Sequence, residues 1–450
     1  MPKATKTVTP RREFLKITGR LAAASALAGV AIPRVHAAED DTIRLALIGA
    51  GNRGSGAVGN AISSPKGPAK LYAMADLFAN RLEGSHKALT QAFGDKIDVP
   101  NQRQFLGFDA YRKAIDCLRP GDVALLTTYS GFRAAHLEYA VQKGVNVFME
   151  KCFAGDTGGV QRILRAGEAA EKKNLKIATG LMCRHSSARQ AMIQQIRDGA
   201  MGQIQLIRTY RMDSGHRQGP WKSQGSELLW QIRRPDLVFW YGSGVFVDWT
   251  IHLIDECCWI KDAWPVSAHG VGGRVANSPD CGQSLDSYSV EYTFADGTKA
   301  MATTRYIANC FNDFATFVHG AKCAGQFSGN IHAPTVYRCK DQRISRGNAA
   351  WKPEAERVSP YQVEWDELLD AIRNDRPYNE TRRSAYSNLA AIMGQAAVHM
   401  GRVITWDEAM ASKFQFCSDA AALTSDSPSP VRADAEGRYP APVPGAWSEI

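Results

Sequence analysis

The sequence predicts an α/β protein that begins with a doubly wound parallel sheet and continues into a second domain rich in strands. Three observations lead to this prediction. An apolar strand-like run at residues 43–48 stops on a glycine triad, as a buried strand does before a phosphate-binding helix. Short apolar runs then alternate with helical stretches as far as residue 180, which a parallel sheet requires. Beyond residue 260, strand-like runs follow one another with turns between them.

The glycines of residues 49–54 have the G-x-G-x-x-G spacing of a dinucleotide-binding turn. Gly49 permits the tight turn, Gly51 leaves room for the backbone to approach a pyrophosphate, and Gly54 lets the next helix pack on the strand. The spacing alone also fits an ordinary glycine-rich turn. A second apolar segment, however, ends on Asp76, 22 residues after Gly54, where the fingerprint expects a carboxylate for the adenosine ribose. Asp76 would repel a 2′-phosphate, so NAD is predicted in preference to NADP.

Residues 1–37 are typical of an export signal and not of a folded domain. The run from Thr9 to Lys16 contains Arg11-Arg12 and is similar to the twin-arginine consensus, an apolar stretch follows at 21–32, and Val35-His36-Ala37 supplies small residues at the cleavage positions. The apolar stretch is shorter than the roughly 20 residues of a transmembrane helix. We therefore predict that the twin-arginine machinery exports the folded protein to the periplasm, where it is soluble after cleavage. An uncleaved membrane tether and a basic disordered N-terminus are the alternatives.

Composition narrows the possible functions. The chain of 450 residues is long enough for two domains. Its net charge is +9, but residues 1–37 contain seven Lys or Arg and one Glu, which leaves only +3 for the remainder. That remainder shows no basic stripe with interleaved aromatic residues, so nucleic-acid binding is not expected. The ten cysteines have no C-x-x-C and no paired ligand spacing, so no metal site is predicted; most thiols are expected to be free and buried, although the pattern leaves disulfides open.

The predicted first domain spans residues 38–180. A helix at 108–118 precedes a buried strand at 122–126, and the residues after this strand lie at the carboxyl edge, where open α/β sheets bind ligands. A helix at 136–143 is ended by Gly144, and a strand at 145–149 runs into Glu150-Lys151-Cys152. A helix at 158–173 and a strand at 176–180 complete the domain.

These residues resemble the Gfo/Idh/MocA oxidoreductases, a family that includes glucose-fructose oxidoreductase and inositol dehydrogenase. Glu150 and Lys151 match the family's Glu-Lys-Pro motif, with Cys152 in place of the proline. In that family the lysine lies near the nicotinamide and the substrate hydroxyl. The resemblance covers about residues 42–410 and implies a Rossmann fold for the first domain.

The fingerprint and the resemblance together give the candidate cofactor-binding residues. They come from the glycine triad, the end of the second strand, the ends of the strands at 122–126 and 145–149, and a helix pattern of the family. They are Gly49, Gly51, Asn52, Arg53, Gly54, Asp76, Thr127, Thr128, Tyr129, His136, Glu150 and Lys151. The Thr127-Thr128 pair matches the family's Thr-Pro only in part.

A second domain is predicted for residues 181–410. A helix near 190–198, a strand at 203–211 and strand-like runs at 263–274, 287–294, 300–307 and 313–320 resemble the large, mostly antiparallel sheet of the family's α+β second domain, which would cover the substrate site with one face. Helices at 361–374 and 384–401 would pack back towards the first domain. Residues 411–450 form a tail rich in Ser, Pro and Ala, which is expected to wrap the surface or a neighbouring subunit.

Residues 242–255 carry the predicted catalytic chemistry. Spacings of four and three residues place Asp248, His252 and Asp255 on one helix face, and the segment resembles the family's Gly-Gly-x-x-x-Asp-x-x-x-His, whose Asp and His face the substrate. We predict His252 as the general base, Lys151 as a donor to the developing alkoxide, and Asp248 as the group that orients the imidazole. The family sometimes gives the acid–base role to the lysine or to a tyrosine, and this choice stays open.

Residues 213–241 are rich in Trp, Arg and Gly and are predicted to be an insertion over the site. Aromatic faces would stack on a sugar ring, and Arg side chains would donate hydrogen bonds. An interface loop in an oligomer explains the composition equally well. The candidate substrate-binding residues are Arg184, His185, Trp240, Tyr241, Asp248 and His252.

The resemblance thus implies an NAD-dependent oxidoreductase that moves a hydride between a sugar or polyol carbon and the nicotinamide, and the N-terminal signal adds the expectation that it is exported. A homodimer or homotetramer is expected. One alternative is an NAD-dependent glycosidase that oxidises its sugar transiently, eliminates the aglycone and re-reduces the product. The other is a non-catalytic sugar-binding relative that kept the fold. Because no pool of soluble NAD is maintained outside the cytoplasm, we expect the cofactor to be exported with the folded protein and held tightly.

Overall fold

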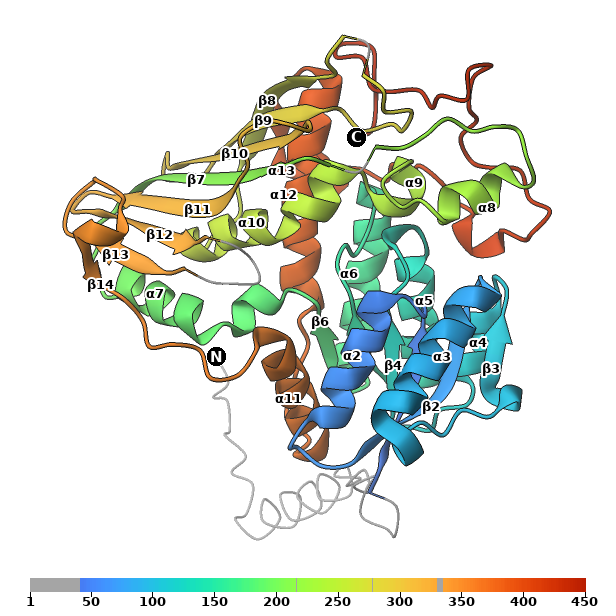
Figure 1. Ribbon diagram of the computed structural model, residues 1–450. Coiled ribbons are helices and arrows are strands. Elements are labelled where there is room, and N and C mark those ends of the chain that lie inside the picture. Colours follow the sequence, from blue (N-terminus) through green and yellow to red (C-terminus); the bar gives the residue numbers. More distant parts are fainter. Residues whose placement is uncertain (1–40, 216, 277, 330–334) are drawn as a thin grey trace, which may run out of the picture. The chain divides into compact units, whose positions relative to one another are not determined.

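The computed structural model describes residues 41–450 except residues 216, 277 and 330–334. Residues Thr42–Ile450 form one compact unit that contains two sheets (Figure 1). The first sheet has six parallel strands in the order β3-β2-β1-β4-β5-β6. Their bounds are β1 Ile43–Ile48, β2 Ala69–Asp76, β3 Gln104–Leu106, β4 Val123–Leu126, β5 Asn146–Met149 and β6 Ile177–Thr179. The strand order reverses between β1 and β4, so the crevice that binds ligands in such sheets lies at the carboxyl ends of these two strands.

Both faces of this sheet are covered, which explains its apolar strands. Alternate residues of β1 belong to two hydrophobic clusters, Ala46 and Ile48 to one and Leu45 and Leu47 to the other. The connecting helices are α2 Asn52–Ser63, α3 Ala79–Phe93, α4 Ala110–Ile115, α5 Ser130–Lys143 and α6 Thr157–Lys172. Helix α5 ends at Gly144, which adopts a left-handed conformation with φ of 74°.

The second sheet has nine strands in the order β14-β13-β12-β11-β7-β10-β9-β8-β15. Only the β10–β7 pair is parallel among the pairings of its described residues. The strands are β7 Ile204–Asp213, β8 Ser267–Gly273, β9 Ser287–Thr293, β10 Lys299–Tyr306, β11 Asp313–Gly320, β12 Ala324–Ser328, β13 Tyr337–Cys339, β14 Ala349–Trp351 and β15 Ile404–Thr405. The predicted fold class is confirmed: a doubly wound parallel sheet is followed by an α+β domain with a large, mostly antiparallel sheet. The short strands β12, β13 and β14 were not predicted, because three to five residues carry little alternation.

Two long helices pack on one face of the second sheet. Helix α10 (Val245–Lys261) lies against β7, β10 and β11, and α12 (Thr381–Met400) lies against β8 and β9. Helix α12 also packs on α6, so it stands between the two sheets (Figure 1). Helix α11 (Pro360–Arg373) returns to the first sheet and packs on α2 and β6. Helix α7 (Ser187–Arg197) contacts α10, and the short α13 (Trp406–Ala411) contacts α12.

The C-terminal tail lies on its own chain. The backbone N–H of Phe416 donates to Asp156 Oδ2 (2.9 Å), the N–H of Tyr439 donates to the carbonyl of Cys281 (2.9 Å), and the Glu449 carboxylate contacts His399 Nδ1 (3.0 Å). The tail also touches residues 213–241, which form two short helices, α8 (Glu227–Ile232) and α9 (Phe239–Gly242). The tail was expected to wrap either the surface of its own chain or a neighbouring subunit, and these contacts lie on its own chain.

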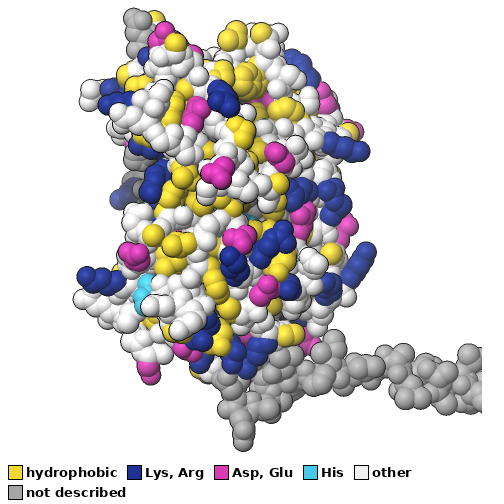
Figure 2. Space-filling view, turned by 90° about the vertical axis from the view of Figure 1, so that its right-hand side faces the viewer, with side chains coloured by type: hydrophobic (Ala, Val, Ile, Leu, Met, Phe, Trp, Pro, Cys, Tyr) yellow, Lys and Arg dark blue, Asp and Glu magenta, His cyan; other side chains and the backbone are white. Residues whose placement is uncertain are grey.

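The surface carries charges of both signs. Figure 2 shows a band of hydrophobic side chains down one face, with Lys and Arg interspersed among Asp and Glu. All ten cysteines are free, and seven are buried. Within the described part of the chain, we find no helix with the length and apolar character that crossing a bilayer requires. The predicted export signal at residues 1–37 lies outside the described residues.

A buried ion pair at the base of the second domain predicts a large effect on stability. Arg189 Nε donates to Glu256 Oε1 (2.8 Å), both side chains are at most 1% exposed, and Thr316 Oγ1 donates to Glu256 Oε2. Arg189→Met leaves a buried carboxylate without this cation and should lower the free energy of unfolding by about 3–5 kcal/mol. Urea unfolding of Arg189→Met, and of Arg197→Met from an exposed pair 4.0 Å apart, measures the difference. A loss below about 1 kcal/mol in both variants would contradict this role of the pair.

Candidate functional site

The turn after β1 requires glycine at two positions. Gly49 has φ of 98°, and a Cβ there would lie 2.7 Å from the Thr128 nitrogen. A Cβ on Gly54 would clash with the Gly49 carbonyl and lie 2.7 Å from Thr127 Oγ1. Gly51 caps α2, and a Cβ on it would meet nothing within 4 Å. The backbone at the N-terminus of α2 therefore borders open space at Gly51, which fits a pyrophosphate bound by the N–H groups of a helix start.

Asp76 lies at the rim of a cavity that begins at this turn, which we call the first cavity. Its Oδ2 accepts a hydrogen bond from the Ala50 N–H (2.7 Å), and its Oδ1 accepts one from the Phe78 N–H (2.8 Å). These bonds fix the carboxylate and leave its other lone pairs for hydroxyl donors. The position of Asp76 in the first cavity fits the adenosine ribose.

The outer part of the first cavity is aromatic, with Phe108, Tyr111, Phe132, His136 and Tyr241 in its wall. His136 stacks on Tyr111 with 4.1 Å between ring centroids, and its Nδ1 lies 3.2 Å from Thr128 Oγ1. Burial, with the positive charges of Arg133 and Arg112, lowers the pKa of His136 to about 3, so the ring is neutral near pH 7. A neutral aromatic wall of this kind suits a planar base.

Two segments distant in the sequence complete the first cavity. Ile232 and Tyr241 come from the segment at 213–241, and Ala420 and Ala421 come from the C-terminal tail. The segment at 213–241 was predicted to lie over the site, and Ile232 and Tyr241 place it in the wall of this cavity. Sequence reasoning missed the contribution of the tail, because two alanines in a stretch rich in small residues carry no local signal. Tyr241, predicted to bind substrate, thus lines the cavity that fits the dinucleotide.

An ion pair lies where the two domains meet. Lys151 follows β5, and Asp248 lies in the first turn of α10. Lys151 Nζ donates to Asp248 Oδ1 and to the Asp248 carbonyl, each at 2.8 Å. Burial alone lowers the pKa of Lys151, but the Asp248 carboxylate and its hydrogen bond raise this pKa above the usual value. Lys151 is therefore a cationic hydrogen-bond donor at neutral pH. Asp248, which was predicted to orient His252, thus also holds the ammonium of Lys151.

Tyr129 connects the first cavity with this ion pair. Tyr129 lines the cavity, and burial, followed by the negative charges of Asp248 and Asp236, raises its pKa to about 12. The phenol therefore keeps its proton near neutral pH. His252 lies one turn beyond Asp248 on α10 and is 8% exposed. The structure thus places a phenol, an ammonium and an imidazole around the junction between the two domains.

Three predicted substrate residues are tied to partners within the protein. Arg184 Nε and Nη2 donate to the two carboxylate oxygens of Asp255 (2.7 and 2.8 Å), which also accepts from Ser387. His185 Nδ1 lies 3.0 Å from Glu367 Oε2. Trp240 is 3% exposed, and its Nε1 donates to Gln231 Oε1 (2.7 Å). These contacts hold the Arg184 guanidinium, His185 Nδ1 and Trp240 Nε1 within the protein, and a role of the three residues in substrate binding stays a prediction.

Arg53, predicted to bind the cofactor, lies between two carboxylates. Its Nε donates to Glu150 Oε1, and its Nη2 donates to Glu364 Oε1 at 3.0 Å. Glu364 is fully buried; burial and the nearby Glu150 raise its pKa well above the usual value. Sequence reasoning missed Glu364, although a glutamate at a buried position of α11, beside Trp365 and one turn before Leu368, was a usable signal.

Known proteins support the fold of both domains. Residues 189–324 match the model of the GFO/IDH/MocA C-terminal domain, and no match was found among curated proteins. The chain is similar to the structure of aldose-aldose oxidoreductase from Caulobacter crescentus complexed with glycerol, at 16% identity and a TM-score of 0.62, over 81% of this chain and 99% of that one. It is also similar to myo-inositol 2-dehydrogenase from Lactobacillus plantarum, at 17% identity and a TM-score of 0.58, over 81% of this chain and 99% of that one. A third similar structure is GenD2 from gentamicin A biosynthesis in complex with NAD, at 16% identity and a TM-score of 0.60, over 81% of this chain and 96% of that one.

The family match and these structures have a limited meaning. The family model matches residues 189–324, and the fold is similar to those of an aldose-aldose oxidoreductase and a myo-inositol 2-dehydrogenase. Identities below one fifth describe the fold and leave the reaction to the site residues. Among the described residues, no three His, Cys, Asp or Glu side chains are grouped so as to hold a metal ion.

The neutral state of His136 predicts a pH dependence of stability. Its pKa of about 3 in the folded protein lies below the ordinary 6.5, so between these values the unfolded chain binds a proton that the folded protein does not. The free energy of unfolding should fall as pH decreases through this window, by up to about 1.4 kcal/mol per pH unit from this group.

Urea unfolding between about pH 7 and pH 4 measures this effect in wild type and in His136→Phe, which keeps the ring and loses the titration. The difference in unfolding free energy between the two proteins should shift by the slope above. Phe132→Leu, which alters a ring stacked beside His136, should differ from wild type by a constant amount. A pH-independent difference for His136→Phe would show that His136 titrates as in the unfolded chain.

Proposed function

We propose that this protein is an NAD(H)-dependent oxidoreductase that acts on a hydroxyl group of a sugar or polyol. One observation carries the proposal: the first cavity, which fits a dinucleotide, leads through Tyr129 to the Lys151–Asp248 pair, one helical turn from His252. The match to the GFO/IDH/MocA C-terminal domain supports it. So do the similar folds, among them the aldose-aldose oxidoreductase, the myo-inositol 2-dehydrogenase and the NAD complex named above.

Different residues of this chain would bind the different parts of NAD. Gly51 and the start of α2 would hold the pyrophosphate, Asp76 the adenosine ribose, and the aromatic wall the adenine. When bound, NAD supplies the acceptor for the hydride of the alcohol. Oxidising an alcohol also requires that the protein accept the proton of its O–H group.

We infer the roles of Lys151, Tyr129 and His252 in the proton transfer from the charges at the junction. Lys151 and Tyr129 both keep their protons near neutral pH, so each donates a hydrogen bond and neither serves as the base. Lys151 stabilises the oxygen of the alcohol as negative charge develops on it, and Asp248 holds the ammonium in place. His252 accepts the proton, since imidazole has an ordinary pKa near neutrality. We therefore favour His252 over Lys151 as the base, a choice that the sequence left open.

The cover over the first cavity supports a tightly held cofactor. Residues of the segment at 213–241 and of the tail both line this cavity, so both would contact bound NAD and slow its dissociation. Together with the predicted twin-arginine signal, this cover favours export of the loaded protein to the periplasm and a redox-neutral cycle. In such a cycle the protein reduces one substrate with the hydride of another, or returns the hydride to the same sugar after an elimination. Hydrolysis of a glycoside without net NADH would identify the second case. The homo-oligomer stays a prediction.

Replacing Lys151 or His252 tests their roles in the reaction. Lys151→Ala and His252→Ala should each lower turnover by at least about a hundredfold, the usual scale for acid–base groups, while NAD stays bound. Steady-state rates and the nucleotide released on denaturation measure the two effects. Lys143→Ala removes a matched ion pair on the surface, with Asp116, and should keep full activity. Full turnover in both site variants would refute the mechanism, and loss of NAD from Lys151→Ala would make Lys151 a cofactor residue.

The tail should control the release of NAD. Ala421→Glu places a large charged side chain in the wall of the first cavity and should speed NAD dissociation by at least about tenfold. Ala446→Glu changes an exposed position of the same tail and should leave the rate as in wild type. Exchange of bound NAD against labelled NAD gives the rates. Exchange within seconds in the wild type, or equal rates in both variants, would contradict retention by the tail.

A further inference from the structure

A second cavity lies beside the first turns of α10. Its wall includes Val245 and Trp249 from α10, Tyr306 at the end of β10, and Asp236 from the segment between α8 and α9. Ser214 and Arg217, which follow β7, lie on another side. None of these side chains belongs to the first cavity, so the second cavity is a separate space.

Helix geometry places the second cavity next to the reacting groups. With about 100° of rotation per residue, Asp248, His252, Val245 and Trp249 fall within about 100° of arc on one side of α10. Val245 and Trp249 line the second cavity, and Asp248 holds Lys151. The charge of Asp236 contributes to the raised pKa of Tyr129 in the first cavity and of Tyr306 in the second. The ion pair is therefore close to the second cavity, since Asp248 and Trp249 are adjacent residues on the same side of α10.

Aromatic rings form one wall of the second cavity, and hydrogen bonds hold them in place. The rings of Trp249 and Tyr306 meet edge to face, with 5.3 Å between centroids and 82° between planes. Trp249 Nε1 donates to Asp236 Oδ1 (3.3 Å), and the Tyr306 hydroxyl donates to the Val245 carbonyl (3.2 Å). Fixed aromatic faces that border polar groups are suited to the apolar face of a sugar ring, whose hydroxyls project from its edge.

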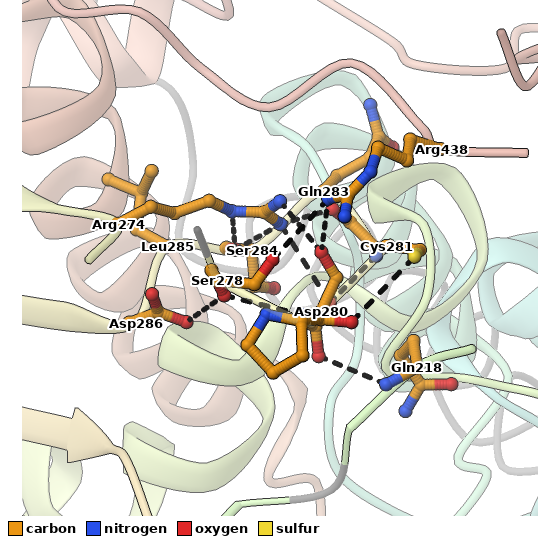
Figure 3. A network of polar contacts seen from close by, with 12 residues as sticks. Gln218, Arg274, Ser278, Asp280, Cys281, Gln283, Ser284, Leu285, Asp286 and Arg438 are labelled. Atoms are coloured by element: carbon orange, nitrogen blue, oxygen red, sulfur yellow. Dashed lines mark hydrogen bonds and ion pairs between the residues drawn. The ribbon is translucent and has the colours of Figure 1, made fainter. Parts of the chain in front are cut away.

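Another part of the wall is a loop whose residues form a network of polar contacts (Figure 3). Asp280 Oδ1 accepts from the Gly282 N–H (2.7 Å), and its Oδ2 accepts from the Gln218 N–H (3.0 Å). Asp286 accepts from the Val275 N–H (2.8 Å), and Arg274 donates to carbonyls of the same loop. These contacts keep the carboxylates of Asp280 and Asp286 at the wall of the cavity, where hydroxyl groups of a ligand could reach their remaining lone pairs.

The charges of the wall favour an uncharged ligand. The described residues of the wall include three carboxylates, Asp236, Asp280 and Asp286, and one guanidinium, Arg217; Arg274, outside the wall, lies 3.8 Å from Asp280. A phosphate or carboxylate on the ligand would face the remaining carboxylates and would lose its hydration without a matching set of donors. Hydroxyl groups, in contrast, donate well to carboxylates.

We propose that the second cavity is a subsite for a second, uncharged sugar ring, so that the substrate is a glycoside or disaccharide oxidised on the ring that lies at Lys151 and Asp248. This inference rests on the proposed oxidoreductase function. No additional reactant is needed: the first ring loses a hydride to NAD and a proton to His252, and the second ring only binds.

Sugars of different length test the subsite. Maltose, cellobiose, lactose and trehalose are compared with glucose and galactose, and a disaccharide that contains a uronate serves as the charged probe. The kcat/KM of the best neutral disaccharide should exceed that of its constituent monosaccharide by at least about tenfold, and the charged probe should lose this advantage. In Trp249→Ala the ratio of disaccharide to monosaccharide should fall about tenfold, and Trp249→Phe should restore it by keeping a ring. Trp264→Ala, in a cluster with Trp406, is the matched control and should leave the ratio unchanged.

Calorimetric titration with the same sugars separates this inference from the proposed function. If monosaccharides are oxidised and no disaccharide has an advantage, the subsite is wrong and the oxidoreductase function stands. If no sugar is oxidised but a disaccharide binds in a way that depends on Trp249, the subsite stands and the function is wrong. If the sugars neither react nor bind, both are overturned.

Discussion

The ion pair between Lys151 and Asp248 joins the end of β5 in the parallel sheet to the first turn of α10 beneath the second sheet. Because Lys151 Nζ binds both the carboxylate and the carbonyl of Asp248, it fixes the start of α10 as well as one side chain. An ammonium buried without its carboxylate costs several kcal/mol, so the two domains are constrained to pack in a way that keeps the pair. Helix α12 also joins the two domains, because it packs on α6 of the first and on β8 and β9 of the second.

The same ion pair influences which of the neighbouring groups keep their protons. Asp248 keeps Lys151 protonated, and burial with nearby negative charge keeps Tyr129 protonated. In the proposed reaction another group must then accept the proton, which is the argument for His252. Behind Lys151, Glu150 is held by Arg53, which also binds the buried Glu364. The position of Lys151 thus depends on charges from β5, α2, α10 and α11.

Features that recur with a fixed spacing or a clear alternation could be predicted from the sequence. Gly49 and Gly54 were found from the spacing typical of such turns, although the contacts that require them come partly from the distant Thr127 and Thr128. The strands at 287–293 and 299–306 alternate clearly between buried and half-buried residues. Features that depend on distant partners could not. Arg184 meets Asp255, 71 residues away, and His185 meets Glu367, 182 residues away. No local sequence pattern indicates these partners, so there was no reason in the sequence to expect that Arg184 and His185 form contacts within the protein.

The central claim is that a sugar hydroxyl is oxidised at Lys151 and His252 by transfer of hydride to NAD in the first cavity. The most direct measurement follows the hydrogen. Purified protein, with NAD added if it carries none, is mixed with a sugar deuterated at all its carbons, and the nucleotide is released by denaturation after a single turnover and weighed by mass spectrometry. The account predicts that reduced nucleotide carries one deuterium. Recovery of unlabelled oxidised nucleotide while the sugar is converted to product would contradict it.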